Sequence, residues 1–497
     1  MALPLRNTLS SASSCDGVAN PAGGAGMVQI HQIQTGPNLT TANRTDYLSS
    51  HRGPEAQMRC CTEGKYCSGD VYSFGSLVRC YLCGISLSKS SLVPNRRTLP
   101  EPRYRVLAVC SHPVQYMAPI FRRMAQHAQL DLHVAYCSLR GVQPVHDPDF
   151  NTTVQWDVPL LAGYAWEEVS NGGSGTECFF GLQNPGLWKL IRGGKFDAVL
   201  CYVGYIHASF WISYFACRSS KTAILFGTDA SSIVPRSGAA WKSPLKKAFW
   251  PVLFSLADQV IIPSTATRDL IRSLGIPEDR ITLTPYSVDN DWWTAQSRQV
   301  DRAAIRGAWG ASSEAAVILF CAKLQPWKRP LDLLHAFAQA RIPDSLLVYA
   351  GEGPQRGELE HQAVSLGVAR HVRFLGFVNQ SQLPAVYTAA DVMVLPSEYE
   401  PFAVVVNEAF CCGTPVVVSD RVGAARDLIA PVDPTLIYPC GDAPALAQLL
   451  RRLLGDRGRL RTLGIAARGR MDAWSPEHNI EATVHAVRCA VERRRAS

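Results

Sequence analysis

DVMVLPSEYEPFAVVVNEAFCCGTPVVVSD, residues 391–420, contains two short apolar runs separated by a stretch with helix signals. The runs DVMVLP and TPVVVSD lack polar alternation, which is typical of strands covered by helices on both faces. Pro401 suits the first position of a helix, Gly413 suits the position just after its end, and Pro415 cannot continue it. The segment therefore predicts a strand, a helix over 401–412 and a second strand.

The same alternation of apolar runs and helical stretches continues on both sides of this segment. Repeated strand–helix units predict parallel sheets, and the runs fall into two sets divided near residues 290–305. We therefore expect an α/β fold of two Rossmann-like domains facing a cleft, where a ligand usually binds. The runs lie at 105–110, 130–137, 197–203, 222–227, 259–263 and 281–286, then at 315–323, 345–351, 372–376, 391–396 and 414–420.

Residues 1–103 are polar and show no sustained periodicity, so we expect a poorly ordered extension, with Met27 and Met58 as candidate later starts. Residues 104–295 are predicted to form the first domain and residues 296–472 the second. Residues 473–497 are predicted to form a C-terminal helix that can pack back onto the first domain.

Composition indicates a globular protein: 47% of the 497 residues are hydrophobic and 18% are charged. The net charge of +8 is mild and suits an anionic ligand or an acidic membrane surface. No nucleic-acid-binding motif is present. The 16 cysteines are scattered and no secretory signal is evident, which favours reduced thiols and a cytoplasmic location, with the inner face of the membrane as an alternative.

Two apolar segments raise the question of membrane contact. Residues 198–217 are long enough for a membrane span, but Gly204 and His207 interrupt them, so a strand, a loop and a buried helix are predicted instead. WKSPLKKAFWPVLF, residues 241–254, mixes lysines with aromatic residues. This stretch fits a helix on an acidic membrane that carries a lipid-linked acceptor, and it fits equally a packed helix with a solvated lysine edge.

No metal site is predicted. The CxxC pair Cys80 and Cys83 has no second pair to complete a zinc site. Two DxD sequences, Asp147 to Asp149 in a loop and Asp289 to Asp291 at the domain boundary, are interpreted as turn or hinge residues.

Glu400 and Glu408 are either surface acids or the two ends of a polar binding site. Glu400 lies at the mouth of the predicted helix, whose first turn, with Phe402 and Ala403, offers unpaired N–H groups to an anion. Glu408 lies two turns further on, roughly 12 Å away at 1.5 Å per residue. Carboxylates accept hydroxyl hydrogen bonds, so the pair suits a sugar and a ribose on either side of a diphosphate.

Basic and imidazole side chains supply the other candidates. Lys323 ends a predicted strand and Lys328 follows in the next loop, where two ammonium groups could neutralise a diphosphate. In the first domain the candidates are His112 after the first strand, His207 and Asp229. A structural histidine at 207 and a helix-capping aspartate at 229 are the alternatives. No P-loop and no strict GxGxxG occurs; GEGPQRG, which contains Gly353, comes near.

Together these motifs resemble the retaining glycosyltransferases of family 4, which have the two-domain GT-B architecture. The family's E-x7-E motif matches Glu400 and Glu408, and its basic pair matches Lys323 and Lys328, with Lys in place of Arg. The family's Gly-Gly loop after the first strand is replaced by SHPVQY. Other stretches that resemble the family are GEGP (351–354), VRFLGFV (372–378) and PYSVDND (285–291). In the first domain, SHPVQYMAPIFRRMA (111–125) and WDVPLLAGY (156–164) resemble a bacterial branch of it.

The resemblance implies transfer of a sugar from a nucleotide-sugar donor to a glycan, lipid-linked or small-molecule acceptor, with retention of configuration and without a metal or other cofactor. Glu408 is then expected to bind the ribose and Glu400 the sugar hydroxyls. Lys323 and Lys328 are expected to stabilise the leaving diphosphate. A nucleotide-sugar epimerase on the same fold and a non-catalytic partner in polysaccharide assembly are the alternatives.

Phe402, Ala403, Gly353 and His112 are the further predicted donor contacts, the first two through the helix N-terminus. His207 and Asp229 are the candidates for a catalytic residue in the first domain.

Overall fold

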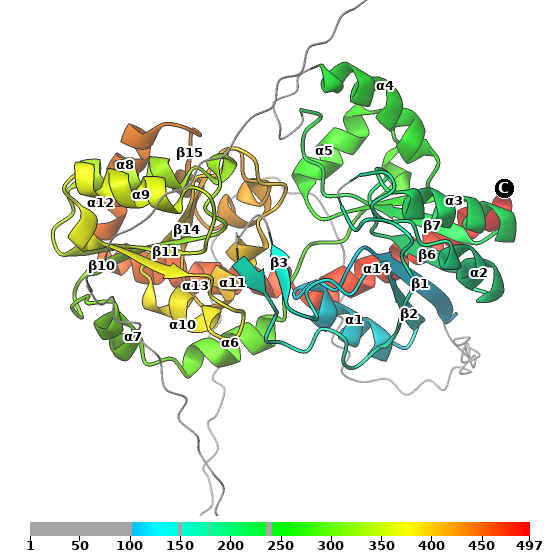
Figure 1. Ribbon diagram of the computed structural model, residues 1–497, viewed down its shortest axis with the longest axis horizontal. Coiled ribbons are helices and arrows are strands. Elements are labelled where there is room, and N and C mark those ends of the chain that lie inside the picture. Colours follow the sequence, from blue (N-terminus) through cyan, green and yellow to red (C-terminus); the bar gives the residue numbers. More distant parts are fainter. Residues whose placement is uncertain (1–101, 148–151, 177, 235–240) are drawn as a thin grey trace, which may run out of the picture. The chain divides into compact units, whose positions relative to one another are not determined.

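A computed structural model describes residues 102–147, 152–176, 178–234 and 241–497 (Figure 1). The predicted extension over residues 1–103 lies almost wholly outside the described residues, together with Met27, Met58, Cys80 and Cys83. The described residues contain two separate parallel sheets, each with helices packed on it. This confirms the predicted fold class of two Rossmann-like domains.

The first sheet has seven parallel strands in the order β5-β2-β1-β6-β7-β8-β9. From β1 the chain adds β2 and β5 on one side, and from β6 it adds β7, β8 and β9 on the other. The topological switch point therefore lies between β1 and β6. β3 (Val145–Asp147) and β4 (Thr152–Val154) pair antiparallel in a separate small sheet. The seven strands are β1 (Tyr104–Cys110), β2 (Leu130–Tyr136), β5 (Ala165–Glu168), β6 (Ala198–Cys201), β7 (Ala223–Gly227), β8 (Gln259–Ile262) and β9 (Ile281–Leu283).

Helices cover both faces of this sheet, which explains why its strands are apolar without alternation. Successive residues of β1 enter different cores: Val106 packs with Ile480 and Val487 of α14, whereas Leu107 packs with Leu187 of α2. Figure 1 shows α14, in red, beside the strands of this sheet, although it follows the second sheet in sequence. The helices are α1 (Met117–Gln126), α2 (Gly186–Gly193), α3 (Ala208–Ser220), α4 (Lys242–Ser255), α5 (Thr265–Ser273) and α14 (Pro476–Ala496).

The second sheet has six parallel strands in the order β12-β11-β10-β13-β14-β15. Its switch point lies between β10 and β13. The strands are β10 (Ala316–Cys321), β11 (Ser345–Ala350), β12 (Val372–Gly376), β13 (Val392–Leu395), β14 (Val416–Ser419) and β15 (Ile437–Tyr438). The helices are α6 (Asn290–Arg298), α7 (Arg302–Ala308), α8 (Pro330–Ala340), α9 (Arg356–Ser365), α10 (Leu383–Ala389), α11 (Val404–Cys411), α12 (Ala443–Leu454) and α13 (Arg457–Arg470).

Every predicted apolar run contains a strand, and the two strands of the large sheets that were not predicted are edge strands. β5 has four residues and is mostly exposed, and β15 has two residues. The predicted limit between residues 295 and 296 falls inside α6, which packs against α10 and α11. The domain limits themselves stay predictions.

The helix predicted over 401–412 begins later, at Val404. Residues 400–402 instead bond to the loop after β14: the Gly423 N–H donates to the Glu400 carbonyl at 2.9 Å, and the Ala424 N–H donates to the Phe402 carbonyl at 2.9 Å. Ala403, with φ +88°, then turns the chain into α11. Pro401 therefore lies outside the helix, whereas Gly413 (φ +77°) ends it as predicted.

The apolar stretch 198–217 forms β6, a loop and most of α3, as predicted. Over the ranges that the structure describes, no helix combines the length and the hydropathy needed to span a bilayer.

Candidate active site

A cavity of about 830 Å³ opens at the carboxyl ends of β1, β6 and β7. The loops after these strands contribute Ser111 and His112, Gly204 and Tyr205, and Thr228 with Asp229. Tyr399 and Pro401 of the second domain also line it. Loops at the carboxyl ends of parallel strands form ligand sites in open α/β folds, so this cavity is the candidate active site.

Asp229 lies in this cavity in an accessible position, although protein atoms surround the carboxyl on most sides. This shielding from water raises the pKa of Asp229, against a backbone hydrogen bond that lowers it, and the negative charge of Glu400 raises it further. The alternative role of a helix cap does not fit, because the next described helix, α4, begins at Lys242 and Trp241 occupies its cap position. The charge of Glu400, from the second domain, therefore reaches the Asp229 carboxyl in the first domain.

The two histidines differ in position. His112 lines the cavity, and its Nδ1 lies 3.0 Å from the Ser111 hydroxyl oxygen. His207 is buried at the start of α3, where its Nδ1–H donates to the Cys178 carbonyl at 3.0 Å. The cavity is lined by the residues just before His207, not by His207 itself. This placement favours a structural role for His207.

Glu400 and Lys328 form an ion pair. Their side chains are only 12% and 18% exposed, respectively. Lys328 ends a short 3₁₀ helix, Pro326–Lys328, and the neighbouring Trp327 carbonyl accepts from the Glu398 N–H at 2.8 Å, which joins the two loops. The predicted sugar-binding acid and the predicted diphosphate-binding base thus lie side by side.

Glu408 is buried in α11, with 5% of its surface exposed. The Tyr387 hydroxyl donates to its Oε2 at 2.7 Å. Burial raises the pKa of Glu408 to about 7, against this hydrogen bond, which lowers it. A carboxyl with such a pKa exchanges its proton near neutral pH.

Gly353 packs against the loop that carries Lys323. Its φ is +154°, and a Cβ at this position would lie 2.6 Å from the Leu324 carbonyl oxygen. The Leu324 N–H also donates to the Glu352 carbonyl at 2.9 Å. Lys323 itself is half-buried in this loop. Gly353 therefore sets the path of the Lys323 loop.

Phe402 is a core residue, with 2% of its surface exposed. Its ring stacks on Trp474 with centroids 6.1 Å apart and meets Tyr286 edge-on at 5.5 Å. Ala403 is also buried. Donor contact at these two residues can therefore come only from the backbone.

Several lining residues were not predicted. Tyr116, Tyr202 and Tyr286 give the cavity an aromatic wall, and Lys246 and Trp250 reach it from α4. The Lys246 ammonium lies 4.9 Å from the centre of the Trp250 ring. Part of the 241–254 stretch, considered above only as a membrane or packing helix, thus belongs to the site. Its alternating Lys and aromatic residues were the available signal.

The aspartates of the two DxD sequences, where the structure describes them, belong to helix starts, strands and ion pairs. Asp289 accepts from the Trp292 N–H at the start of α6, and Arg123 pairs with Asp289 at 2.9 Å and with Asp291 at 2.8 Å. Asp147 ends β3, not a loop as expected, and Asp149 lies outside the described residues. Among the residues that the structure covers, no group of three or more His, Cys, Asp or Glu side chains is placed to hold a metal ion.

Sequence comparison finds similar glycosyltransferases. An uncharacterized glycosyltransferase of Methanocaldococcus jannaschii is 29% identical over 61% of this chain and 81% of its own length. A D-inositol 3-phosphate glycosyltransferase of Geodermatophilus obscurus is 33% identical over 47% of this chain. That match spans only 53% of the relative, so the chain covers about half of it.

Solved structures share the fold. A glycosyltransferase from Rickettsia africae superposes with a TM-score of 0.61 at 15% identity, over 78% of this chain and 99% of that one. The Anabaena protein HepE, in complex with UDP and glucose, gives 0.58 at 17% identity, over 77% and 99%. These likenesses establish the GT-B architecture.

Family models match both halves of the described chain. Residues 168–292 match "Glycosyltransferase Family 4" and residues 301–470 match "Glycosyl transferases group 1". Together the matches leave out only 293–300 between residues 168 and 470, and so cover more than half of the chain. The chain belongs to the family 4 glycosyltransferases.

Proposed function

We propose that this glycosyltransferase moves a hexose from a nucleoside-diphosphate donor to a hydroxyl group of a glycan, lipid-linked or small-molecule acceptor, with retention of configuration and without a metal. The observation that carries the proposal is the ion pair of Lys328 and Glu400 beside the first-domain cavity. The Lys328 ammonium group suits the diphosphate, and the Glu400 carboxylate suits sugar hydroxyls.

The reaction breaks the bond between the anomeric carbon and the diphosphate oxygen, which keeps the electron pair. The acceptor oxygen forms the new bond on the same face, through an oxocarbenium-like state, and its proton passes to the departing diphosphate. Lys323 and Lys328 would stabilise the negative charge that develops on the diphosphate, which is a large catalytic term in such sites. Glu400 and Asp229 would hold sugar hydroxyls and face the developing positive charge.

The buried Glu408 would bind the ribose of the donor. Its carboxyl already accepts one hydroxyl hydrogen bond, from Tyr387, and a carboxylate has room for others. The half-buried Lys323 and the backbone of Gly353 would lie beside the phosphates.

The surface of α4 supports a further proposal, contact with an anionic membrane that presents a lipid-linked acceptor on its cytoplasmic face. Trp241, Leu245, Phe249 and Val252 are 67%, 60%, 41% and 58% exposed. Their spacing of four, four and three residues places them on one side of the helix. The exposed Lys242 and Lys247 suit anionic headgroups, and Lys246 of the same helix lines the active-site cavity.

A transfer assay with the whole chain tests the enzymatic proposal. Nucleotide sugars, UDP-glucose among them, are incubated with candidate acceptors in the presence of a chelator, and nucleotide release and product anomer are measured. Acceptor-dependent release with a retained anomer, lost in Lys323→Ala but kept in the exposed control Lys189→Ala, is expected. Conversion of the donor without an acceptor would favour an epimerase. Activity that requires an added divalent cation would overturn the metal-free mechanism.

A further inference from the structure

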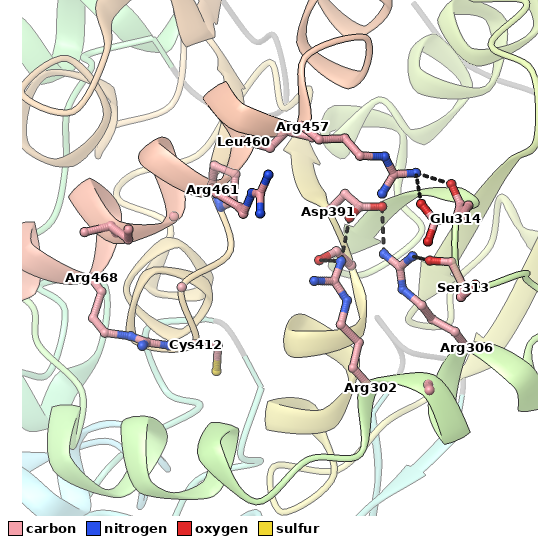
Figure 2. A pocket seen from close by; sticks show the side chains of 16 residues that line it. Arg302, Arg306, Ser313, Glu314, Asp391, Cys412, Arg457, Leu460, Arg461 and Arg468 are labelled. Carbon is pink, nitrogen blue, oxygen red and sulfur yellow. Dashed lines mark hydrogen bonds and ion pairs between the residues drawn. The ribbon is translucent and has the colours of Figure 1, made fainter.

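A second cavity, of about 690 Å³, lies on the second domain between α7, α13 and the turn that follows α11. It shares no lining residue with the candidate active site. Figure 2 shows its charged side chains. Arg457, Arg461 and Arg468 come from one face of α13, because residues four and seven apart recur on the same side of a helix. Ligand cavities commonly have about 300–1,000 Å³.

The charges that line this cavity do not balance. Five arginines meet two carboxylates, Asp391 and Glu314, which leaves three positive charges in excess. Asp391 accepts from Arg306 at 2.7 Å and from Arg302 at 2.5 Å, and Glu314 lies 3.7 Å from Arg457. The five arginines are Arg302, Arg306, Arg457, Arg461 and Arg468.

The arginines differ in whether their hydrogen-bond donors are already used by the fold. Arg306 is 3% exposed and donates to the carbonyls of Ala389 and Ala315 at 2.8 and 3.0 Å, so its donors are used by the fold. Arg461 is exposed, and within the described residues no hydrogen bond or ion pair holds it. Its guanidinium therefore has donors for a ligand.

The excess of positive charge in the cavity also affects the pKa of Arg302. Burial lowers its pKa, and the charges of Arg306 and Arg457 lower it further, despite the opposing effect of Asp391. A nearby anion would relieve this repulsion.

Two glycines bring the walls together. A Cβ on Gly464 of α13 would lie 2.4 Å from the Gly413 carbonyl oxygen, so the helix can approach the turn only without a side chain there. Gly413 has φ +77°, and a Cβ on it would lie 2.8 Å from a terminal nitrogen of Arg468. Arg468 also donates to the Cys411 carbonyl at 3.3 Å. The position of Arg468 at the cavity wall is thus fixed by the packing of α13 on α11.

We propose that this cavity binds a small soluble molecule that carries two phosphate groups. Guanidinium groups match phosphate oxygens with paired hydrogen bonds, and each phosphate group carries a charge of about −1.5 to −2, so two groups balance the excess. Ala303, Leu460 and Ile465 border the arginines and leave room for an organic part of the ligand. This binding is separate from the proposed donor site.

Titration calorimetry of the full-length chain with inorganic diphosphate tests the proposal, and hydrogen exchange locates the binding. We expect slower exchange in α7 and α13. We also expect affinity about tenfold or more weaker in Arg457→Ala/Arg461→Ala, because each variant position loses charged hydrogen bonds. The control Arg452→Ala/Arg488→Ala removes the same charge from exposed helix positions and should bind as the wild type does.

Diphosphate also suits the lysines of the proposed donor site, so the same titration is repeated in Lys323→Ala. Protection of α13 that persists in Lys323→Ala supports the second site, whatever becomes of the proposed enzymatic function. Protection confined to residues 322–328, or no binding at millimolar diphosphate, overturns it. If the double variant is not folded by circular dichroism, the exposed single substitution Arg461→Glu replaces it, and unchanged binding there overturns the proposal equally.

Discussion

Lys328 and Glu400 are 72 residues apart in sequence, and the structure pairs their charges in a partly shielded position. Neither side chain can move into water without leaving the other uncompensated. A phosphate that approaches Lys328 and a hydroxyl group that approaches Glu400 would therefore share an already organised pair, whose reorganisation on binding is small.

Lys328→Met should lower kcat by about 100-fold, because removing one preorganised donor from a site that stabilises developing charge has an effect of this order. Steady-state kinetics with the donor identified by the screen measure the change. Lys189→Met, an exposed lysine of α2, should leave kcat unaltered. Equal rates for wild type and Lys328→Met would remove Lys328 from the mechanism.

Glu408 should make stability depend on pH. Its folded pKa of about 7 lies above the ordinary value of 4.5, so the folded state holds this proton more tightly than the unfolded state does. The resulting stabilisation is full below about pH 4.5 and is lost as the pH rises through about 7. Between these limits the loss is at most about 3 kcal/mol.

Urea unfolding at several pH values measures this effect. Glu408→Gln does not titrate, so its stability relative to the wild type should improve from pH 4.5 to pH 7 and then level off. Glu492→Gln, at an exposed glutamate of α14, should follow the wild type. Parallel curves for wild type and Glu408→Gln would show that the Glu408 pKa is ordinary.

The alternation of apolar runs predicted the central strands because burial on both faces leaves a direct mark on composition. Two of the four edge strands, β9 and β12, also lie in apolar runs, whereas β5 and β15 were not predicted, because β5 is mostly exposed and β15 has only two residues. The helix start predicted at Pro401 was wrong, because the residues on either side of Pro401 form backbone hydrogen bonds with the loop after β14. Such a long-range contact leaves no local signal in the sequence.

The same limit applies to the site. The spacing of Glu400 and Glu408 could be found in the sequence, and so could Lys323 and Lys328. The pairing of Lys328 with Glu400, the tyrosine wall and the contribution of Lys246 depend on which loops meet, and this is decided by tertiary packing.

Gly353→Ala should destabilise the fold and disturb catalysis together. A Cβ would come within 2.6 Å of the Leu324 carbonyl oxygen, and the backbone φ of +154° disfavours any side chain. A cost of about 1–3 kcal/mol is expected for such strain. Thermal unfolding and kcat are the measurements. Gly357→Ala in α9, where a Cβ meets open space, should instead be neutral or stabilising.

Contact of α4 with a membrane can be tested by co-sedimentation with vesicles of anionic phospholipid. Leu245→Glu and Phe249→Glu should each weaken binding about 10- to 150-fold, because burying such a side chain contributes about 1.5–3 kcal/mol. Added salt should weaken binding further through Lys242 and Lys247. Val364→Glu in α9, at a residue 69% exposed, is the matched control. Equal sedimentation of all four proteins would exclude α4 as the contact.

The packing of α14 on the first sheet has a consequence for synthesis of the chain. One face of that sheet acquires Ile480 and Val487 only from α14, which is translated after the strands of the second sheet. The first sheet is thus completed only after the second domain has been translated, and its uncovered face must stay out of aggregates during that time. A chain that stops before Pro476 would keep that apolar face exposed and become a substrate for chaperones and proteases.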